Sequence, residues 1–470
     1  MKNLRWLIIT LIGIATIINY VDRTSLAVMW KSISADLRLT DNDYATIVFF
    51  FMCAYALGQA LIGKAFDRIG TRIGLTLTML VWIASCGLLS LARGIASIGM
   101  FRALLGFSEA GNWPGATKTA AAWFPNHERA LAQGIFNAGA SLGAVVSAPI
   151  VAFLYMHLGW KATYLVIGAA GLVWVLPWWF IARSSAADHP WISQEERDYI
   201  LGTGNAGVPP ADEGRPNPRH TGHHLDRGRD ARRIPSAGGT PALPAIPNSG
   251  MTWGEAVSHR QTWAVLASRF FLDPIWWIFV NWLPLILAKS FGYEIKEIGA
   301  TAFVPYVGAF CGSLFGGWYS GWRIRQGRTV NRARKQAILL GGAVTIVGFV
   351  LAIYALTIAQ PGLPITWRQP GIALAGMAFV LCGFQIMINN VQTLPSDFYS
   401  GKSVGNVAGL GGLVAVAGVL VFSTWLIPAI TKISYVPVFI MAVCFVPLGI
   451  VMVYLFGGEI RRVDVSEKHS

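Results

Sequence analysis

Long runs of apolar residues restrict the fold of this chain more than any other feature of its sequence. A helix needs about 20 apolar residues to span the hydrocarbon core of a bilayer, whereas a transmembrane barrel would show alternating segments of about ten residues. Runs of the longer kind occupy residues 5–30, 44–66, 73–92, 96–121, 130–155, 160–182, 262–289, 298–322, 336–358, 371–396, 403–430 and 435–457. With 54% hydrophobic and 13% charged residues among 470, the chain also has more apolar surface than a water-soluble domain can bury. The sequence therefore predicts an all-α membrane protein with twelve transmembrane helices.

The basic residues predict how the chain is oriented in the membrane. The first run starts after Lys2 and Arg5 and continues to Trp30 without a small-residue cleavage site, so we expect an uncleaved first helix. The net charge of +14 could suggest a nucleic-acid partner, but Lys and Arg also mark the cytoplasmic loops of membrane proteins. Basic loops at 64–72 and 323–335 fall on the same side as the termini. We therefore expect no nucleic-acid partner, and a multi-pass protein of the plasma (inner) membrane with both termini in the cytoplasm.

A polar segment, residues 183–261, divides the chain into two predicted six-helix bundles, 1–182 and 262–470. Its part from 203 to 250 is rich in Pro, Gly and Arg and lacks helical periodicity, so we expect this cytoplasmic linker to be largely disordered there. The flanks, Ser193–Tyr199 and Met251–Val257, predict two short surface helices. Neither the five cysteines nor the histidines of the linker show ligand spacing, so no disulfide or metal site is expected.

The loop between the second and third apolar runs carries a charged motif, GKAFDRIGTR at residues 63–72. Gly63 and Gly70 allow close helix ends and a tight turn. Asp67 is suited to cap the N-terminus of a neighbouring helix and to pair with a basic side chain, and Arg68 and Arg72 complete the motif. We expect these contacts to hold one conformation closed.

This loop, placed between spans two and three of twelve, resembles the major facilitator superfamily. Four further motifs resemble its anion:cation symporter branch: NYVDRT from residue 19, RALLGFSEAGNWP from 102, WFPNHERA from 123 and FNAGASLG from 136. RFFLDPIW from residue 269 and the pair Ser396-Asp397 are most similar to hexuronate transporters. The resemblance implies a monomeric, proton-coupled symporter that imports a small organic anion, such as glucuronate or galacturonate, by alternating access. It needs no cofactor, because the proton gradient supplies the energy.

Four charged residues lie within the apolar runs: Asp22, Arg23, Arg102 and Glu109. Each costs about 2.5–3.5 kcal/mol at the centre of a spanning helix. One interpretation is a structural ion-pair network; the other is a site in which the acids carry protons. The four charges cancel, so a bound monocarboxylate would leave an excess of one negative charge that one proton neutralises. We expect Arg23 to bind the substrate carboxylate, with Asp22, Glu109 and Arg102 responsible for proton coupling.

The C-terminal spans carry amides and indoles, which suit sugar hydroxyls. The residues predicted to bind the substrate are Tyr20, Arg23, Asn137, Trp277, Asn281, Asn389, Asn390 and Thr393. Packing of the indoles and hydrogen bonds between helices are alternative roles. Arg269 is judged too close to the start of its helix to act as a second anion-binding arginine.

Other functions stay open at this point. An aldonate or glucarate symporter fits the same residues, and an organophosphate:phosphate antiporter belongs to the same branch. A non-transporting membrane sensor is the alternative from a different class. An enzyme is not expected, because the chain lacks a nucleophile with an adjacent base and a phosphate-binding loop.

Overall fold

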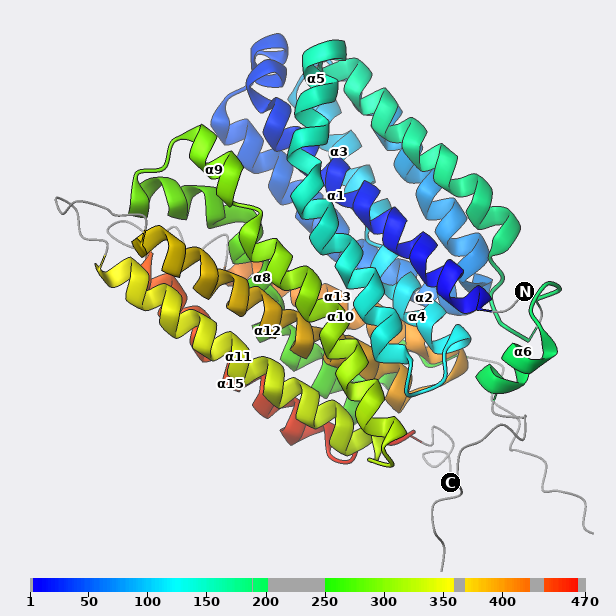
Figure 1. Ribbon diagram of the computed structural model, residues 1–470. Coiled ribbons are helices and arrows are strands. Elements are labelled where there is room, and N and C mark those ends of the chain that lie inside the picture. Colours follow the sequence, from blue (N-terminus) through cyan, green and yellow to red (C-terminus); the bar gives the residue numbers. More distant parts are fainter. Residues whose placement is uncertain (1–2, 188, 202–249, 359–367, 423–434, 464–470) are drawn as a thin grey trace, which may run out of the picture.

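The computed structural model describes residues 3–187, 189–201, 250–358, 368–422 and 435–463 (Figure 1). These residues form helices and contain no strand. The helices are α1 (Leu4–Leu37), α2 (Asp41–Leu89), α3 (Ile95–Glu109), α4 (Asn112–Trp123), α5 (Arg129–Ile181), α6 (Gln194–Leu201), α7 (Trp253–Ser258), α8 (Arg260–Phe291), α9 (Ile295–Thr301), α10 (Val304–Arg325), α11 (Val330–Ile358), α12 (Arg368–Phe398), η1 (Gly401–Ser403), α13 (Val404–Val419) and α15 (Val436–Gly457).

Nine helical segments among the described residues are long and apolar enough to cross a membrane. Two of them are unusually long, since α2 has 49 residues and α5 has 53. Each is interrupted by one glycine outside helical geometry, Gly70 with φ 78° and Gly159 with φ 73°. A residue with a side chain rarely adopts these left-handed angles, whereas glycine does so at no steric cost. Both breaks fall between predicted spans, which were expected to end and restart near 66–73 and 155–160.

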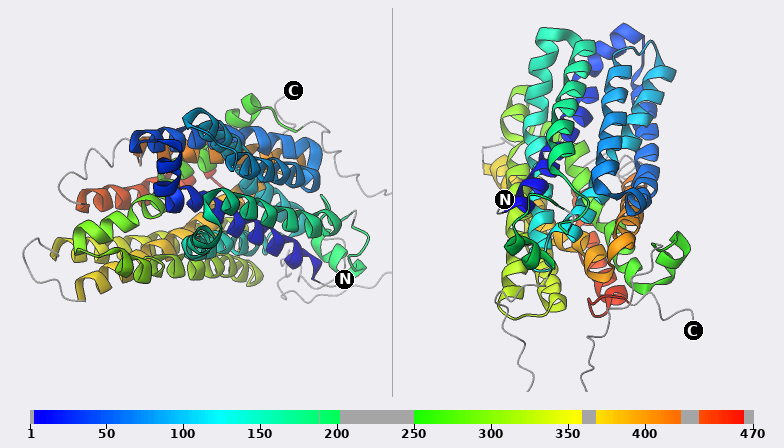
Figure 2. Two further views of the ribbon diagram at one scale, coloured as in Figure 1. Left: turned by 90° about the horizontal axis from the view of Figure 1, so that it is seen from above. Right: turned by 90° about the vertical axis from the view of Figure 1, so that its right-hand side faces the viewer.

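The buried apolar side chains form two clusters. One is built almost entirely from residues before Met251, and the other mainly from Met251 onward. In the ribbon views, α1 to α5 (blue to teal) lie together beside α8 to α15 (green to red) (Figures 1 and 2). Between the two groups, α5 packs against α10, and α13 packs against α2 as well as α8. Residues from both halves of the chain therefore face each other along a central interface.

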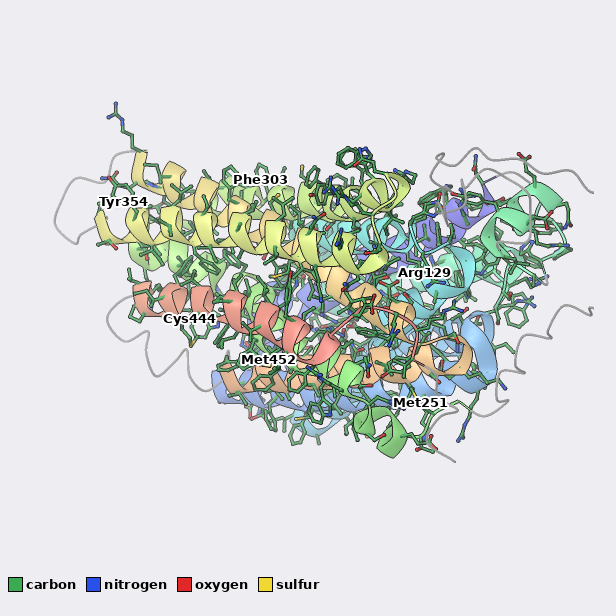
Figure 3. All side chains as sticks on the ribbon, turned by 90° about the horizontal axis from the view of Figure 1, so that it is seen from below. Arg129, Met251, Phe303, Tyr354, Cys444 and Met452 are labelled. Atoms are coloured by element: carbon green, nitrogen blue, oxygen red, sulfur yellow. The ribbon has the colours of Figure 1, made fainter. Side chains whose placement is uncertain are left out.

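Many large apolar side chains lie on the outside of this helical assembly. Phe303 and Tyr354 are examples, with 43% and 57% of their surfaces exposed, and the thiol side chain of Cys444 is also exposed (Figure 3). A water-soluble protein would bury such side chains, whereas lipid can cover them. The surface thus agrees with a protein that spans a membrane.

Both short helices predicted in the flanks of the linker are present, as α6 and α7. α6 is docked against the start of α1, where the Glu196 carboxylate accepts a hydrogen bond from the Leu4 backbone N–H at 3.1 Å. Apart from Gly250, the residues predicted to be disordered (203–250) lie outside the described residues, and so does the end of the predicted span 403–430.

Candidate functional site

A cavity with an empty volume of about 550 Å³ lies at the interface between the two halves of the chain. Its walls come from α1, α2, α4 and α5 on one side and from α8, α12 and α13 on the other. Four of the predicted substrate-binding residues line it: Tyr20, Arg23, Asn137 and Trp277.

Arg23 forms the charged part of the N-terminal wall. Its Nη2 donates a hydrogen bond to Oε2 of Glu109 at 3.1 Å, and Glu109 is only 1% exposed. Four aromatic rings surround the guanidinium at 4.9–5.8 Å from its central carbon, namely those of Tyr20, Phe51, Tyr55 and Trp277. The ion pair therefore lies in a largely apolar environment. In such an environment the interaction energy between the guanidinium and a carboxylate is larger than in water, so replacing one carboxylate by another has a large energetic effect.

Neither buried partner of this pair is saturated with hydrogen bonds. Among the described residues, Nε of Arg23 and Oε1 of Glu109 are buried and have no hydrogen-bond partner. Arg23 thus has a donor to spare for a second anion, and Glu109 has an oxygen on which a proton can be held without breaking another contact.

Asp22 and Arg102, like Glu109, do not line the cavity. Oδ2 of Asp22 accepts hydrogen bonds from Trp82 Nε1 at 2.6 Å and from Cys86 Sγ at 3.1 Å. Nη2 of Arg102 donates to Tyr164 Oη at 3.3 Å and to a serine on α1. These contacts hold α1, α2, α3 and α5 together, so the two residues have surroundings that also suit a structural role.

One aromatic contact crosses the interface at the cavity wall. Trp276 Nε1 on α8 donates to Tyr20 Oη on α1 at 2.9 Å, and their rings meet edge to face. Tyr20 lies three residues before Arg23 on the same helix, so this contact joins the anion-binding wall to α8.

Amide side chains form a second connection between the halves. Asn137 Nδ2 on α5 donates to Asn389 Oδ1 on α12, and at 2.8 Å to Gln392 Oε1 on the same helix. Asn389 Nδ2 in turn donates to the Ser313 carbonyl of α10 at 2.7 Å. Asn137 lines the cavity, but Asn389 is fully buried between α5, α10 and α12.

Three further predicted residues also lie away from the cavity wall. Asn390 and Thr393 donate to backbone carbonyls of their own helix, those of Ile386 at 2.9 Å and Asn389 at 2.7 Å. Asn281 is exposed, although it follows the cavity-lining Trp277 by one helical turn. In this conformation, therefore, none of these three residues and Asn389 lines the cavity, contrary to expectation. The side chains of Asn389, Asn390 and Thr393 form hydrogen bonds within or between helices, and that of Asn281 is exposed.

The structure also brings a charged pair, Arg269 and Asp273, to the wall of the cavity. Nε and Nη2 of Arg269 donate to Asp273 Oδ2 at 3.0 and 2.7 Å, and both residues line the cavity. Arg269 was expected to be too near its helix start, but α8 begins at Arg260, more than two turns earlier. An Arg and an Asp four residues apart in an apolar helix are the signal that could have identified the pair.

Three glutamines, Gln59, Gln385 and Gln392, also line the cavity without having been predicted as site residues. Oε1 of Gln59 and Oε1 of Gln385 are buried and have no hydrogen-bond partner among the described residues. Such oxygens are suited to accept hydrogen bonds from the hydroxyl groups of a ligand.

The charged loop motif joins α2 to α13 at one end of the interface. Oδ1 and Oδ2 of Asp67 accept hydrogen bonds from the backbone N–H groups of Gly405 at 3.0 Å and Asn406 at 2.7 Å, at the N-terminus of α13. Asp67 also pairs with Lys118 Nζ at 2.5 Å. Both contacts expected of Asp67, the helix cap and the basic partner, are therefore present.

The backbones approach closely at the same place. A Cβ atom at Gly63 would lie 2.4 Å from the Gly405 carbonyl oxygen, so only glycine fits. Of the other motif residues, Gly70 provides the turn in α2, Arg72 donates to the Trp179 carbonyl of α5 at 3.0 Å, and the Arg68 side chain is exposed.

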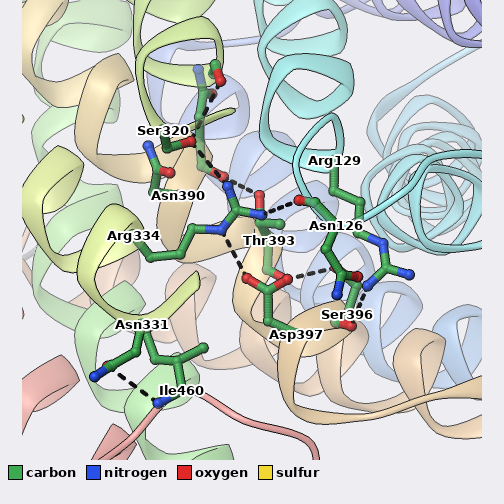
Figure 4. A network of polar contacts seen from close by, with 12 residues as sticks. Asn126, Arg129, Ser320, Asn331, Arg334, Asn390, Thr393, Ser396, Asp397 and Ile460 are labelled. Carbon is green, nitrogen blue, oxygen red and sulfur yellow. Dashed lines mark hydrogen bonds and ion pairs between the residues drawn. The ribbon is translucent and has the colours of Figure 1, made fainter. Parts of the chain in front are cut away.

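A second set of contacts closes the same end of the interface (Figure 4). Arg334 Nε pairs with Asp397 at 2.8 Å, and Arg334 Nη2 donates to the Asn126 carbonyl at 2.9 Å. Arg129 Nη1 donates to the Ser396 carbonyl at 2.8 Å. We call the contacts of Asp67, Arg129 and Arg334 across the interface the closure.

Within the described residues, no group of three or more His, Cys, Asp and Glu side chains could hold a metal ion. The linker histidines lie outside the described residues, so the expectation of no metal site there stays a prediction.

Comparisons with known proteins agree with this architecture. The family model described as "Major Facilitator Superfamily" matches residues 12–423. A hexuronate transporter of Escherichia coli (strain K12) is 26% identical over 99% of this chain and 97% of its own length. A galacturonate transporter of Dickeya chrysanthemi is 29% identical over 67% of this chain and 81% of its own length. Among solved structures, that of the proton:xylose symporter XylE bound to 6-bromo-6-deoxy-D-glucose is similar in fold, with a TM-score of 0.67, 14% identity, and coverage of 97% of this chain and 96% of the other.

Proposed function

The chain belongs to the Major Facilitator Superfamily, and from this premise we propose that it is a proton-coupled symporter that imports a hexuronate by alternating access. That it is a transporter and not an enzyme follows from its family and its relatives. The hexuronate substrate is supported by the names of two of these relatives. The proton coupling is argued from the cavity itself.

The observation that carries the proposal is the ion pair between Arg23, which lines the cavity, and the buried Glu109, which lines a separate smaller pocket. A substrate carboxylate that enters the cavity competes with Glu109 for the guanidinium, which binds carboxylates through two parallel hydrogen bonds. Once displaced, Glu109 is a buried carboxylate without its ion-pair partner. Such a group is stabilised by taking up a proton.

The coupling follows from the net charge of the site. The empty site is neutral, and so is the site that holds one carboxylate and one proton. A site that holds the carboxylate alone carries an uncompensated charge, which makes movement through the low-dielectric membrane interior unfavourable. In this scheme only the empty and the doubly loaded carrier change conformation readily, which makes the transport a symport.

We further propose that the chain crosses the membrane twelve times in two six-helix bundles, joined by the linker at 183–261. The glycine breaks divide α2 and α5 into two crossings each, and α3 with α4 makes one more. The basic residues near the closure favour the cytoplasm for that end and for both termini, in the plasma (inner) membrane. We also propose that the carrier acts as a monomer and uses no cofactor.

Uptake into proteoliposomes tests the function. Labelled glucuronate and galacturonate should accumulate with an inward proton gradient, and Glu109→Gln should abolish the accumulation because its side chain cannot carry the proton. Uptake that does not depend on the gradient would contradict symport and favour exchange, whereas no uptake of either sugar acid would favour another substrate or the sensor alternative.

Unlabelled competitors in the same assay address the alternative substrates. Arg269 gives the cavity a second arginine, which a phosphate-ester antiporter would use, but its pairing with Asp273 favours a substrate of lower charge. We expect a hexuronate to compete better than an aldonate, glucarate or a sugar phosphate. Stronger competition by any of these three would reassign the substrate.

A further inference from the structure

Arg269 lies where two cavities meet. It lines the central cavity, and it also lines a smaller cavity with an empty volume of about 260 Å³. Trp113 and Gln392 are shared by the two cavities in the same way. Since neighbouring cavities with common walls are adjacent, a ligand that leaves the central cavity on this side passes the Arg269 side chain.

The smaller cavity lies directly inside the closure. Its wall contains Thr117, which precedes Lys118, and Pro395, which precedes Ser396. Lys118 holds Asp67, and the Ser396 carbonyl accepts the hydrogen bond of Arg129. The smaller cavity is therefore the space that the central cavity would open into if the closure separated.

The pairing of Arg269 with Asp273 leaves the guanidinium able to bind another anion. Both hydrogen bonds of the pair end on Oδ2 and come from Nε and Nη2, so Nη1 of Arg269 and Oδ1 of Asp273 take no part in them. Together the two side chains are neutral, which lets them stay buried when no substrate is present. The arrangement repeats the Arg23–Glu109 pair, where a cavity arginine is held by an acid that a carboxylate can replace.

Polar groups in the smaller cavity suit a hydroxylated ligand. Gln133 and Thr117 line it, and Gln133 Nε2 donates to Thr117 Oγ1 at 2.9 Å. Oε1 of Gln133 is buried without a hydrogen-bond partner among the described residues, so an acceptor is left for a ligand hydroxyl.

We propose that Arg269 is a second binding site for the substrate carboxylate, occupied after Arg23 while the substrate moves toward the closure. Asp273 then competes with the carboxylate for Arg269, and this competition lets the substrate leave. The inference rests on the proposed function, because it requires a carboxylate substrate. It adds to that function a path with two anion sites, one from each half of the chain.

Two variants separate this role from a structural one. In Asp273→Asn, Arg269 keeps its charge but loses its competitor. Purified protein should then bind labelled glucuronate at least about threefold more tightly, while uptake into proteoliposomes slows at least about tenfold. In the double variant Arg269→Gln with Asp273→Asn, the site stays neutral but the anion site is lost, so uptake should slow without tighter binding.

Ser268→Ala is the matched control. Ser268 is buried on the same helix and donates only within it, to the Ala264 and Val265 carbonyls, so its removal should change neither binding nor uptake. Elution of each detergent-solubilised variant as a single species checks that it is folded. If the Asp273→Asn variant is not folded, the double variant still tests the proposal, because its uptake should be slowed while its binding is unchanged.

The outcomes are distinct. Uptake at the wild-type rate in both variants would overturn the inference, and so would binding that weakens in proportion to uptake, because the pair would then belong to the first site or to the scaffold. If wild-type protein neither binds nor transports glucuronate, the proposed function fails and this inference falls with it.

Discussion

Charge balance decides what each acidic residue around the cavity can do. The charges of six side chains in and around the cavity, five of them buried and that of Arg23 partly buried, cancel: Asp22, Arg23, Arg102, Glu109, Arg269 and Asp273. Of the two acids predicted to carry the proton, Asp22 is held by Trp82 and Cys86 outside the cavity, whereas Glu109 contacts Arg23 directly. A carboxylate on Arg23 therefore changes the surroundings of Glu109 most, and we assign the proton to Glu109.

Binding should depend on pH in one direction. In the proposed mechanism the bound site holds one more proton than the empty site. Protons and substrate then favour each other's binding, and affinity should fall as pH rises. For one linked proton the decrease is up to about tenfold per pH unit. Calorimetric titration of glucuronate from pH 5 to pH 8 measures it, with Glu109→Gln as the variant that should lose the dependence. An affinity that is constant over this range would contradict the assignment.

At the residue level, the sequence selected the ion pair of Arg23 and Glu109 but not the cavity-lining pair of Arg269 and Asp273, and it expected more asparagines at the cavity than the structure places there. A charged side chain within an apolar run costs free energy in the membrane wherever it lies, so it indicates a function or a partner. Arg23 and Glu109 could therefore be selected without a structure. An amide can be satisfied by any nearby backbone, and the carbonyls that Asn389 and Asn390 reach depend on how α10 crosses α12. Helical spacing alone also could not show that Trp277 faces the cavity while Asn281 is exposed.

At the level of helices, the contact of α2 with α13 is the part of the closure that the sequence described most completely. The motif residues set both the cap by Asp67 and the close approach at Gly63, because each depends on chemistry local to the loop. The partner helix could not be named in advance, since α13 begins more than 300 residues later. Apolar runs located the long apolar helices because a bilayer requires continuous apolar helices, and the breaks at Gly70 and Gly159 fall between predicted spans.

Removing the charge of Asp67 should loosen this end of the interface. In Asp67→Asn the N-terminus of α13 loses an anionic cap, which contributes about 1 kcal/mol, or about a fivefold change in the population of the open form. Lys118 also loses its partner. A cysteine placed at Gln133, in a chain without the five native cysteines, should then react severalfold faster with a water-soluble thiol reagent.

Asp43→Asn provides the comparison for this experiment. Asp43 also caps a helix, through the capping box with Thr40 at the start of α2, but it is away from the closure. Its removal should leave the labelling rate at Gln133→Cys unchanged. Equal rates in Asp67→Asn and in the unmodified background would show that the cap does not hold the closure.

In the whole molecule, the two halves meet around a cavity whose walls they share. One end of their interface is held by hydrogen bonds between the charged side chains of Asp67, Arg129 and Arg334 and backbone groups of the opposite half. Arg334, which is fully buried, bonds to both Asp397 on α12 and the Asn126 carbonyl of the other half. Alternating access requires such contacts to form and break as the carrier moves. In the proposed scheme, these contacts can break in the empty carrier and in the carrier that holds both carboxylate and proton, but not in the carrier that holds the carboxylate alone.

Proton movement that accompanies hexuronate entry tests this account most directly. Proteoliposomes with a pH-sensitive dye inside and no initial pH gradient would receive external glucuronate. The account predicts that the lumen acidifies as glucuronate enters, by about one proton per molecule, and that Glu109→Gln gives no acidification. Glucuronate entry without acidification in the wild-type protein, or acidification by Glu109→Gln at the wild-type rate, would contradict the assignment of Glu109 as the proton carrier.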